Sequence, residues 1–361
     1  MWSHLKKLDW YLIVSSILLV ILGLVSLYSS SLRDKDFLNF NKQIIFFIIG
    51  IFLMFLISLL DWRIFKENSY LILIIYLICV ILVLGLFFFA PSIRGVRRWY
   101  KIAGFTLDPV EAMKLVLIII LAKYFSIRHV EMYNIRHILV SAAYVFLPVI
   151  LVFFQPDLGS SIILILLWLG ILLISGIKIK HLLILIICGI LIFTLGWSFF
   201  LKDYQKQRVI SFIAPHADPL GAGWQQKQSK IAIGSGRIFG QGLGKGAQTQ
   251  YGFLPEKQTD FIFAAIAEEM GLVGIIIMLS LFLFMIFRIT KIAVLAQSNF
   301  ARLFSSGLVV LFISQIFVNI AMNLGLVPII GIPLPLISYG GSNLIFTFAA
   351  LGILQSIKAN T

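Results

Sequence analysis

Charged residues are scarce in this chain. Only 12% of its 361 residues are Asp, Glu, Lys or Arg, whereas about a quarter are charged in an average soluble domain. A water-soluble globular domain of this length is excluded, because its surface could not be covered with charged groups. Since 60% of the residues are hydrophobic and gather in long runs, the composition indicates a membrane protein whose spans are helices.

Cysteine and histidine are also rare. The two cysteines, Cys79 and Cys188, lie within apolar runs, so the sequence contains no disulfide framework and no cysteine-based metal site. The five histidines are scattered without ligand spacing, which argues against a metal site built by the protein. Without a soluble basic domain, the net charge of +14 does not indicate nucleic-acid binding. It indicates cytoplasmic loops and contacts with membrane lipids.

Ten apolar runs are long enough to cross a bilayer. They cover residues 10–29, 43–60, 70–90, 109–127, 138–154, 160–177, 181–201, 261–287, 303–323 and 342–357. The first is long for a signal-peptide core, so we interpret it as a retained span. An even number of spans places both termini on one side, and the basic residues of the short alternate loops place that side in the cytoplasm. We predict a single polytopic all-α domain over residues 1–361.

One segment departs from this composition. Residues 202–259, between the seventh and eighth spans, contain nine glycines and eight basic residues but only three acidic ones. Long loops between spans are usually functional or disordered, and the apolar residues of this one argue against disorder. We predict an ordered extracytoplasmic loop in which residues 222–233 form a helix on the membrane surface.

A second irregular segment lies between the ninth and tenth spans. Residues 325–342 contain three prolines among glycines and apolar residues. Helix breakers at membrane depth are tolerated where the backbone is buried in protein or lines a cavity, so we predict a re-entrant segment. Ser338 and Tyr339 would then present their hydroxyl groups to that cavity.

Asp260 is the strongest candidate for a catalytic residue. It lies directly before the apolar run that begins at Phe261, and Glu256 and Thr259 precede it closely. Apolar surroundings disfavour an ionised carboxylate, so an acid at the mouth of a membrane span is a functional candidate by default.

Two basic segments are predicted on the same face as Asp260. In the glycine-rich run 234–246, backbone N–H groups could approach an anion while Arg237 and Lys245 supply positive charge, which suits a phosphate or pyrophosphate. The run is equally compatible with a flexible turn.

The second basic segment either anchors the chain at the interface or binds another anionic group. Its cations are Arg94, Arg97, Arg98 and Lys101.

Polar side chains at the ends of two further spans complete the candidate site. Glu111 and Lys114 share one helix face, so they could form an ion pair, and charges inside a span usually face a cavity. Gln155 and Asp157 end the fifth span, and Asp157 could equally be a simple cap of the sixth.

Taken in order, these segments resemble the SEDS family of membrane proteins, named for shape, elongation, division and sporulation. The matching motifs occupy residues 95–99, 108–114, 155–159, 217–223, 228–236, 254–263, 268–271 and 331–341. Each motif is weak alone, whereas their joint order is specific. The 217–223 and 331–335 motifs resemble the rod-elongation members more than the division members. Three residues depart from the usual Gln, Ser and Ser of the family: Asp108, Val110 and Asn343.

The resemblance implies a peptidoglycan glycosyltransferase in the bacterial cytoplasmic membrane. Such an enzyme polymerises lipid II at the outer face, and the family's catalytic aspartate aligns with Asp260. One general base can deprotonate the acceptor hydroxyl as it attacks the anomeric carbon, which inverts that carbon. The resemblance also implies a class B penicillin-binding transpeptidase as partner. It is compatible with Mg²⁺ or Mn²⁺ bridging pyrophosphate oxygens, for which the sequence shows no ligand set.

Two other functions use the same residues. A lipid II flippase would employ Asp260, Glu111 and Lys114 as relay charges, but it would distribute polar residues along a path through the membrane. A noncatalytic scaffold for a penicillin-binding protein would need no ordered basic loop beside an acid. The concentration of polar residues at the outer face favours the enzyme.

Overall fold

The computed structural model describes residues 5–91, 97–102, 104–128, 135–199, 203–214, 218 and 221–360. Arg94 of the basic patch and part of the 217–223 motif therefore lie outside the described residues.

A long helix overlaps each of the predicted apolar runs in the described part of the chain. These helices are α2 (Trp10–Ser31), α3 (Leu38–Ser58), α5 (Ser69–Phe89), α6 (Pro109–Arg128), α7 (Ile135–Phe154), α8 (Leu158–Ile174), α9 (Ile179–Phe199), α13 (Ile262–Leu295), α14 (Asn299–Leu324) and α15 (Gly341–Ala359). Shorter helices are α4 (Arg63–Glu67), α10 (Asp203–Ile213), α11 (Ala222–Ser235) and α12 (Ala247–Gln250).

Seven of the described helices are long and apolar enough to cross a membrane: α2, α3, α5, α7, α13, α14 and α15. Helix α6 is of similar length but carries Glu111, Lys114, Lys123 and Arg128, and α8 has only 17 residues. The chain is thus a helical, multi-pass membrane protein, as its composition predicted.

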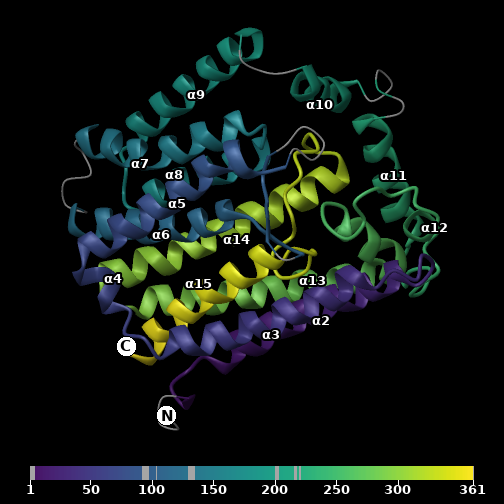
Figure 1. Cartoon of the computed structure of the whole chain (residues 1–361), viewed down its shortest axis with the longest axis horizontal. Helices are drawn as coiled ribbons and strands as arrows, with labels where there is room; N and C mark the ends of the chain where they lie inside the picture. The colour runs from purple at the N-terminus through teal and green to yellow at the C-terminus, as the bar shows by residue number, and fades with distance from the viewer. Residues whose placement is uncertain are drawn as a thin grey trace.

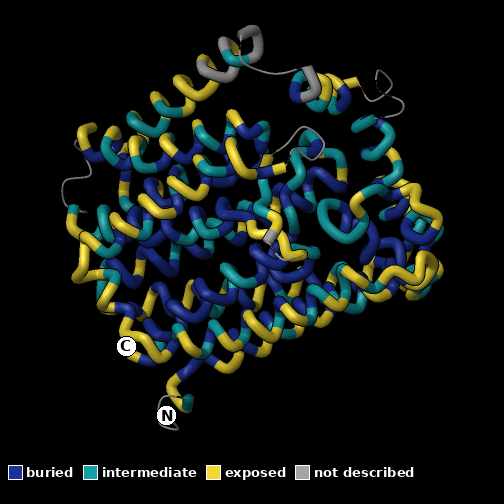
Figure 2. The backbone as a smooth tube through the Cα atoms, in the orientation of Figure 1, coloured by how far each residue is buried: buried dark blue, intermediate teal, exposed yellow. Residues whose placement is uncertain are grey.

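The long helices form one bundle with two distinct ends. The start of α2 and the end of α15 lie at one end, whereas α10, α11 and α12 gather at the other (Figure 1). Buried residues concentrate along α6, α14 and α15 in the middle of the bundle (Figure 2). Glycines allow α3 and α15 to pack closely, because a Cβ on Gly352 would lie 2.8 Å from the carbonyl oxygen of Met54.

A short hairpin between α5 and α6 makes the all-α prediction incomplete. Strand β1 (Tyr100–Ile102) pairs antiparallel with β2 (Phe105–Leu107), and Tyr100 lies opposite Leu107. Gly104, with a φ of 83°, forms part of the turn. Strands of three residues are too short to show an alternating pattern in the sequence.

Between α14 and α15 the chain runs without a helix or strand over residues 325–340. Two glycines let this Pro/Gly segment approach neighbouring helices. A Cβ on Gly23 of α2 would lie 2.4 Å from the carbonyl oxygen of Ile337, and one on Gly159 of α8 would lie 2.5 Å from that of Ile330. The segment is therefore irregular backbone packed inside protein, the setting in which such backbone is tolerated in membranes.

Candidate active site

Asp260 lies just before α13, and α14 holds its backbone. Asn319 and Asn323, one helical turn apart, each donate a side-chain amide hydrogen bond to the carbonyl oxygen of Asp260, at 3.1 and 3.0 Å. Asn319 also donates to the carbonyl oxygen of Ile332 at 2.8 Å. The amide of Asn319 thus joins Asp260 to the Pro/Gly segment.

The Pro/Gly segment holds the residues directly before Asp260. The Ser338 hydroxyl donates to the carbonyl oxygen of Thr259 at 2.6 Å and accepts from Leu334 N at 2.8 Å. Tyr339 N donates to the carbonyl oxygen of Gln258 at 2.8 Å. We expected the Ser338 hydroxyl to face a cavity, but its hydrogen bonds instead link the Pro/Gly segment to the residues before Asp260.

The carboxylate of Asp260 lies beside Gly331, where a Cβ would come within 3.3 Å of Oδ2. Burial, together with the nearby charge of Glu256, raises the pKa of Asp260 to about 6. The positive charges of Arg98 and of Arg208, on α10, act in the opposite direction. A carboxyl group with this pKa is suited to accept a proton near neutral pH.

Arg98 is surrounded by acidic side chains. Its Nε lies 2.5 Å from Asp108 Oδ2 and 3.3 Å from Asp157 Oδ2, and its Nη2 lies 3.6 Å from Glu111 Oε1. Burial lowers the pKa of Arg98, but the three carboxylates raise it by more, so the guanidinium remains charged. Arg98 therefore joins the loop before α6 to the start of α8.

The predicted ion pair between Glu111 and Lys114 is confirmed. Lys114 Nζ lies 2.7 Å from Glu111 Oε1, and both side chains are buried. Asn343, at the start of α15, donates to Glu111 Oε2 at 3.0 Å. Two of the residues that depart from the family pattern, Asp108 and Asn343, thus contact the same charged cluster.

The other predicted residues near this cluster have local contacts. Asp157 caps α8 by accepting from Ser160 N at 3.0 Å, and its Oδ2 also contacts Arg98. Gln155 Nε2 donates to the carbonyl oxygen of Val83 at 2.6 Å. Arg97 is exposed and donates to the carbonyl oxygen of Phe87 at 2.5 Å, away from the acidic side chains that bind Arg98.

The glycine-rich run 234–246 does not form an open anion cradle. Two of the backbone N–H groups in and after it, those of Gly244 and Thr249, donate to carboxylates of the chain itself, Glu269 at 3.3 Å and Glu268 at 2.9 Å. The side chains of Arg237 and Lys245 are exposed. Glycine is required here for close packing on α13, since a Cβ on Gly236 would overlap the carbonyl group of Ala267.

Three residues near Asp260 were missed by the sequence analysis. Asn319 and Asn323 could have been found, because two asparagines four residues apart in an apolar span share one helix face. Arg208 gave no comparable signal, since it is one of many cations in the long loop.

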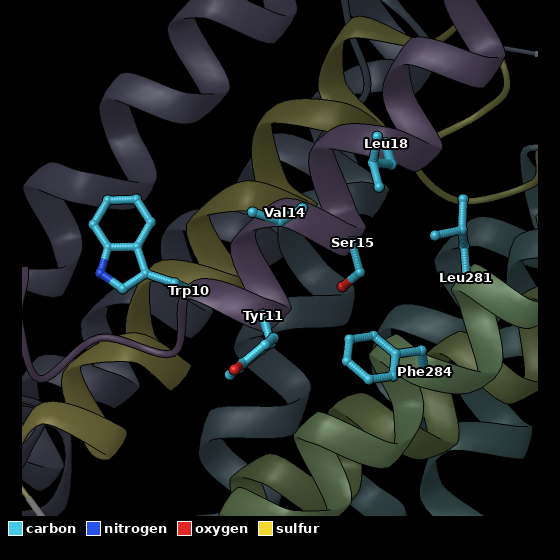
Figure 3. A pocket seen from close by; sticks show the side chains of 7 residues that line it. All are labelled: Trp10, Tyr11, Val14, Ser15, Leu18, Leu281 and Phe284. Atoms are coloured by element: carbon cyan, nitrogen blue, oxygen red, sulfur yellow. The ribbon is translucent and has the colours of Figure 1, made fainter.

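An apolar groove of about 330 Å³ lies elsewhere, between α2 and α13 (Figure 3). It is lined by Trp10, Tyr11, Val14, Ser15, Leu18, Leu281 and Phe284. Its lining offers no cation for an anionic substrate and includes none of the predicted site residues, so we place the candidate site at Asp260 instead.

Comparison with known proteins shows the family to which the chain belongs. The family model for FtsW, RodA and SpoVE, described as cell cycle protein, matches residues 9–361. The chain is 37% identical to peptidoglycan glycosyltransferase MrdB of Escherichia coli K12, over 95% of this chain and 92% of that protein. It is 33% identical to stage V sporulation protein E of Bacillus subtilis, over 97% of this chain and 96% of that protein.

Solved structures share the fold. A chain from a structure described as "Structural coordination of polymerization and crosslinking by a peptidoglycan synthase complex" is similar with a TM-score of 0.84 and 28% identity, over 98% of both chains. The crystal structure of the rod shape determining protein RodA of Thermus thermophilus gives a TM-score of 0.71 and 27% identity, over 97% of this chain and 96% of that one. The chain therefore belongs to the FtsW, RodA and SpoVE family, and it is a peptidoglycan glycosyltransferase.

Proposed function

We propose that this glycosyltransferase polymerises lipid II during cell elongation, with Asp260 as its general base. The observation that carries the proposal is the setting of Asp260: its backbone is held by Asn319 and Asn323, and its pKa is raised to about 6. The name of the Escherichia coli relative supports an enzyme over the flippase and scaffold alternatives.

The reaction that we propose is a single displacement. Ionised Asp260 takes the proton from a hydroxyl of the acceptor sugar while that oxygen attacks the anomeric carbon of the donor. The bond from the anomeric carbon to the pyrophosphate oxygen breaks, and the pyrophosphate lipid leaves with the electron pair. One attack inverts the anomeric carbon, so an α-linked donor gives a β-linked polymer.

Cations at this end of the bundle would stabilise the leaving group. We propose that Arg98, Arg237 and Lys245 contact substrate pyrophosphate, a role supported for the last two by their exposed side chains. A Mg²⁺ or Mn²⁺ ion would act through the pyrophosphate oxygens, and the rate with added Mg²⁺ against a chelator tests this point.

We also propose the topology that the sequence predicted. The chain would cross the membrane ten times with both termini in the cytoplasm, residues 202–259 outside, and a re-entrant Pro/Gly segment. The start of α2 and the end of α15 at one end of the bundle support this arrangement (Figure 1). A class B penicillin-binding transpeptidase is the proposed partner, supported by the similar chain from a peptidoglycan synthase complex.

The direct test is polymerisation of purified lipid II by the purified protein, with and without a class B penicillin-binding protein. We expect glycan strands that a muramidase specific for β linkages cleaves. Absence of polymer under both conditions would contradict the proposed substrate, and strands that resist the muramidase would contradict inversion.

A further inference from the structure

Helix α13 is broken at Gly271, whose φ of 65° and ψ of −162° are not helical. Residues 262–270 therefore form a short helix of their own, and Asp260 lies just ahead of its first turn. In a continuous α-helix each N–H binds the carbonyl oxygen four residues earlier. The break frees buried backbone groups, which must find partners elsewhere.

The glycine-rich run supplies those partners. Four backbone hydrogen bonds join it to the break: Gln241 N to Glu268 O at 2.9 Å, Gly242 N to Glu269 O at 3.0 Å, Leu272 N to Arg237 O at 2.9 Å and Val273 N to Ile238 O at 3.1 Å. Only glycine allows this approach, because a Cβ on Gly271 would lie 2.3 Å from Gly240 N. The glycine-rich run thus occupies the break in α13 and is hydrogen-bonded to both sides of it.

Two buried carboxylates then hold the end of the run and helix α12, which directly follows it. The side chains of Glu268 and Glu269 belong to residues that are 0% and 2% exposed. Their donors are Gln248 N (2.7 Å), Thr249 N (2.9 Å) and Thr249 Oγ1 (2.6 Å) for Glu268, and Gly244 N (3.3 Å) and Gln250 Nε2 (3.0 Å) for Glu269. Such buried carboxylates are stable only while these donors are present.

We propose that Glu268 and Glu269 are positioning residues for Asp260. Asn319, Asn323 and Ser338 fix the start of the 262–270 helix. The two glutamates fix its end, because they bind Gly244 and α12 and so hold the glycine-rich run in the break. Because a short helix held at both ends cannot rotate, the Asp260 carboxylate keeps one orientation toward the acceptor hydroxyl. The inference rests on the proposed role of Asp260 as the base.

A purely structural role for the glutamates predicts something different. Loss of a structural contact lowers the amount of folded protein but leaves the rate per folded molecule and its pH dependence unchanged. Loss of positioning lowers kcat, since catalysis is sensitive to small displacements of the base, and leaves KM nearly constant. Loss of positioning also exposes the Asp260 carboxyl group to solvent, which lowers its pKa. The pH of half-maximal rate therefore moves below about 6.

The experiment compares Glu268→Gln with Asp9→Asn in purified full-length protein. Asp9 is a matched control, because it is a buried carboxylate paired with Arg288 at the opposite end of α13. With lipid II as substrate, Glu268→Gln is expected to lower kcat by about 10-fold or more with KM within about 3-fold. Asp9→Asn is expected to keep the wild-type kcat per folded molecule, and Glu268→Asp to recover part of the loss.

Two further variants keep the test decisive. Thr249→Val removes one donor to Glu268 with little change of shape, so a lower kcat at unchanged KM supports positioning even where Glu268→Gln does not fold. A wild-type kcat and pH profile in Thr249→Val and in folded Glu268→Gln would overturn the inference. Wild-type activity in Asp260→Asn would instead overturn the proposed function, so the two failures are distinguishable.

Discussion

Asp260 is subject to two opposing influences. It precedes the first turn of α13, where the helix dipole favours a negative charge. Burial has the larger effect, however, and raises the pKa of its carboxyl group to about 6. An acid held in this way is ionised at neutral pH yet remains a better proton acceptor than an exposed aspartate.

The rate of polymerisation is expected to rise with pH and to reach half its maximum near pH 6. Because the pKa is raised, protonated Asp260 predominates below that value and the rate is lost as pH falls through it. Initial rates at saturating lipid II, from about pH 5 to about pH 8, check this expectation. A rate that is constant over this interval is incompatible with the assignment.

Glu111 and Lys114 should respond unequally to substitution. Glu111→Ala leaves the Lys114 ammonium buried without its ion-pair partner, a loss of typically about 3–5 kcal/mol where burial is complete. Lys114→Ala is expected to cost less, since Arg98 and Asn343 remain near Glu111. Thermal unfolding of both single variants and the double variant measures the coupling, and additive effects would contradict the pairing.

At the scale of elements, α14 supports Asp260 through one polar face of an apolar helix. Gln315, Asn319 and Asn323 are spaced four residues apart and are all buried. The two asparagines donate to the carbonyl oxygen of Asp260, whereas Gln315 Nε2 has no hydrogen-bond partner among the residues that the structure describes. Gln315 can therefore serve as a matched control for substitutions of the two asparagines.

Asn319→Leu and Asn323→Leu are each expected to lower kcat by about 10-fold, because the carbonyl oxygen of Asp260 loses a donor and its peptide is free to move. Gln315→Leu, one turn away, should stay within about 2-fold of the wild-type kcat. A loss of kcat in Gln315→Leu as large as in the two asparagine variants would contradict a specific role for the hydrogen bonds to Asp260.

The elements differ in how far the sequence predicted them. Apolar runs located the long helices because span length follows from membrane thickness. The Glu111–Lys114 pair followed from helical spacing, which is a local property. The break at Gly271 and the binding of α12 by Glu268 depend on residues far apart in the chain, and no local pattern predicts them.

At the scale of the whole molecule, polar function concentrates at one end of the bundle. The Asp260 loop and the glycine-rich run both contact the end of α2, where Gln258 Nε2 donates to Ser30 and Gly244 N donates to Ser29. The start of α2 and the end of α15 lie at the opposite end (Figure 1). This separation is expected of an enzyme whose substrate is used on one side of the membrane.

The proposed orientation can be tested with single cysteines in a variant lacking Cys79 and Cys188. Phe239→Cys should react in intact cells with a maleimide that cannot cross the membrane, because Phe239 is 81% exposed in the loop assigned to the outside. Arg63→Cys, at the opposite end, should react only after lysis. The reverse pattern would invert the topology.

Asp260→Asn removes the proposed general base, and its kcat is the decisive measurement. The amide keeps the shape of the side chain but does not take up the hydroxyl proton. Above about pH 6 the variant should be at least as stable as wild type, because the ionised carboxylate of raised pKa costs free energy in the folded state. We predict folded protein that still binds the proposed transpeptidase partner and forms no glycan strands from lipid II. Strands formed at the wild-type rate would contradict the account.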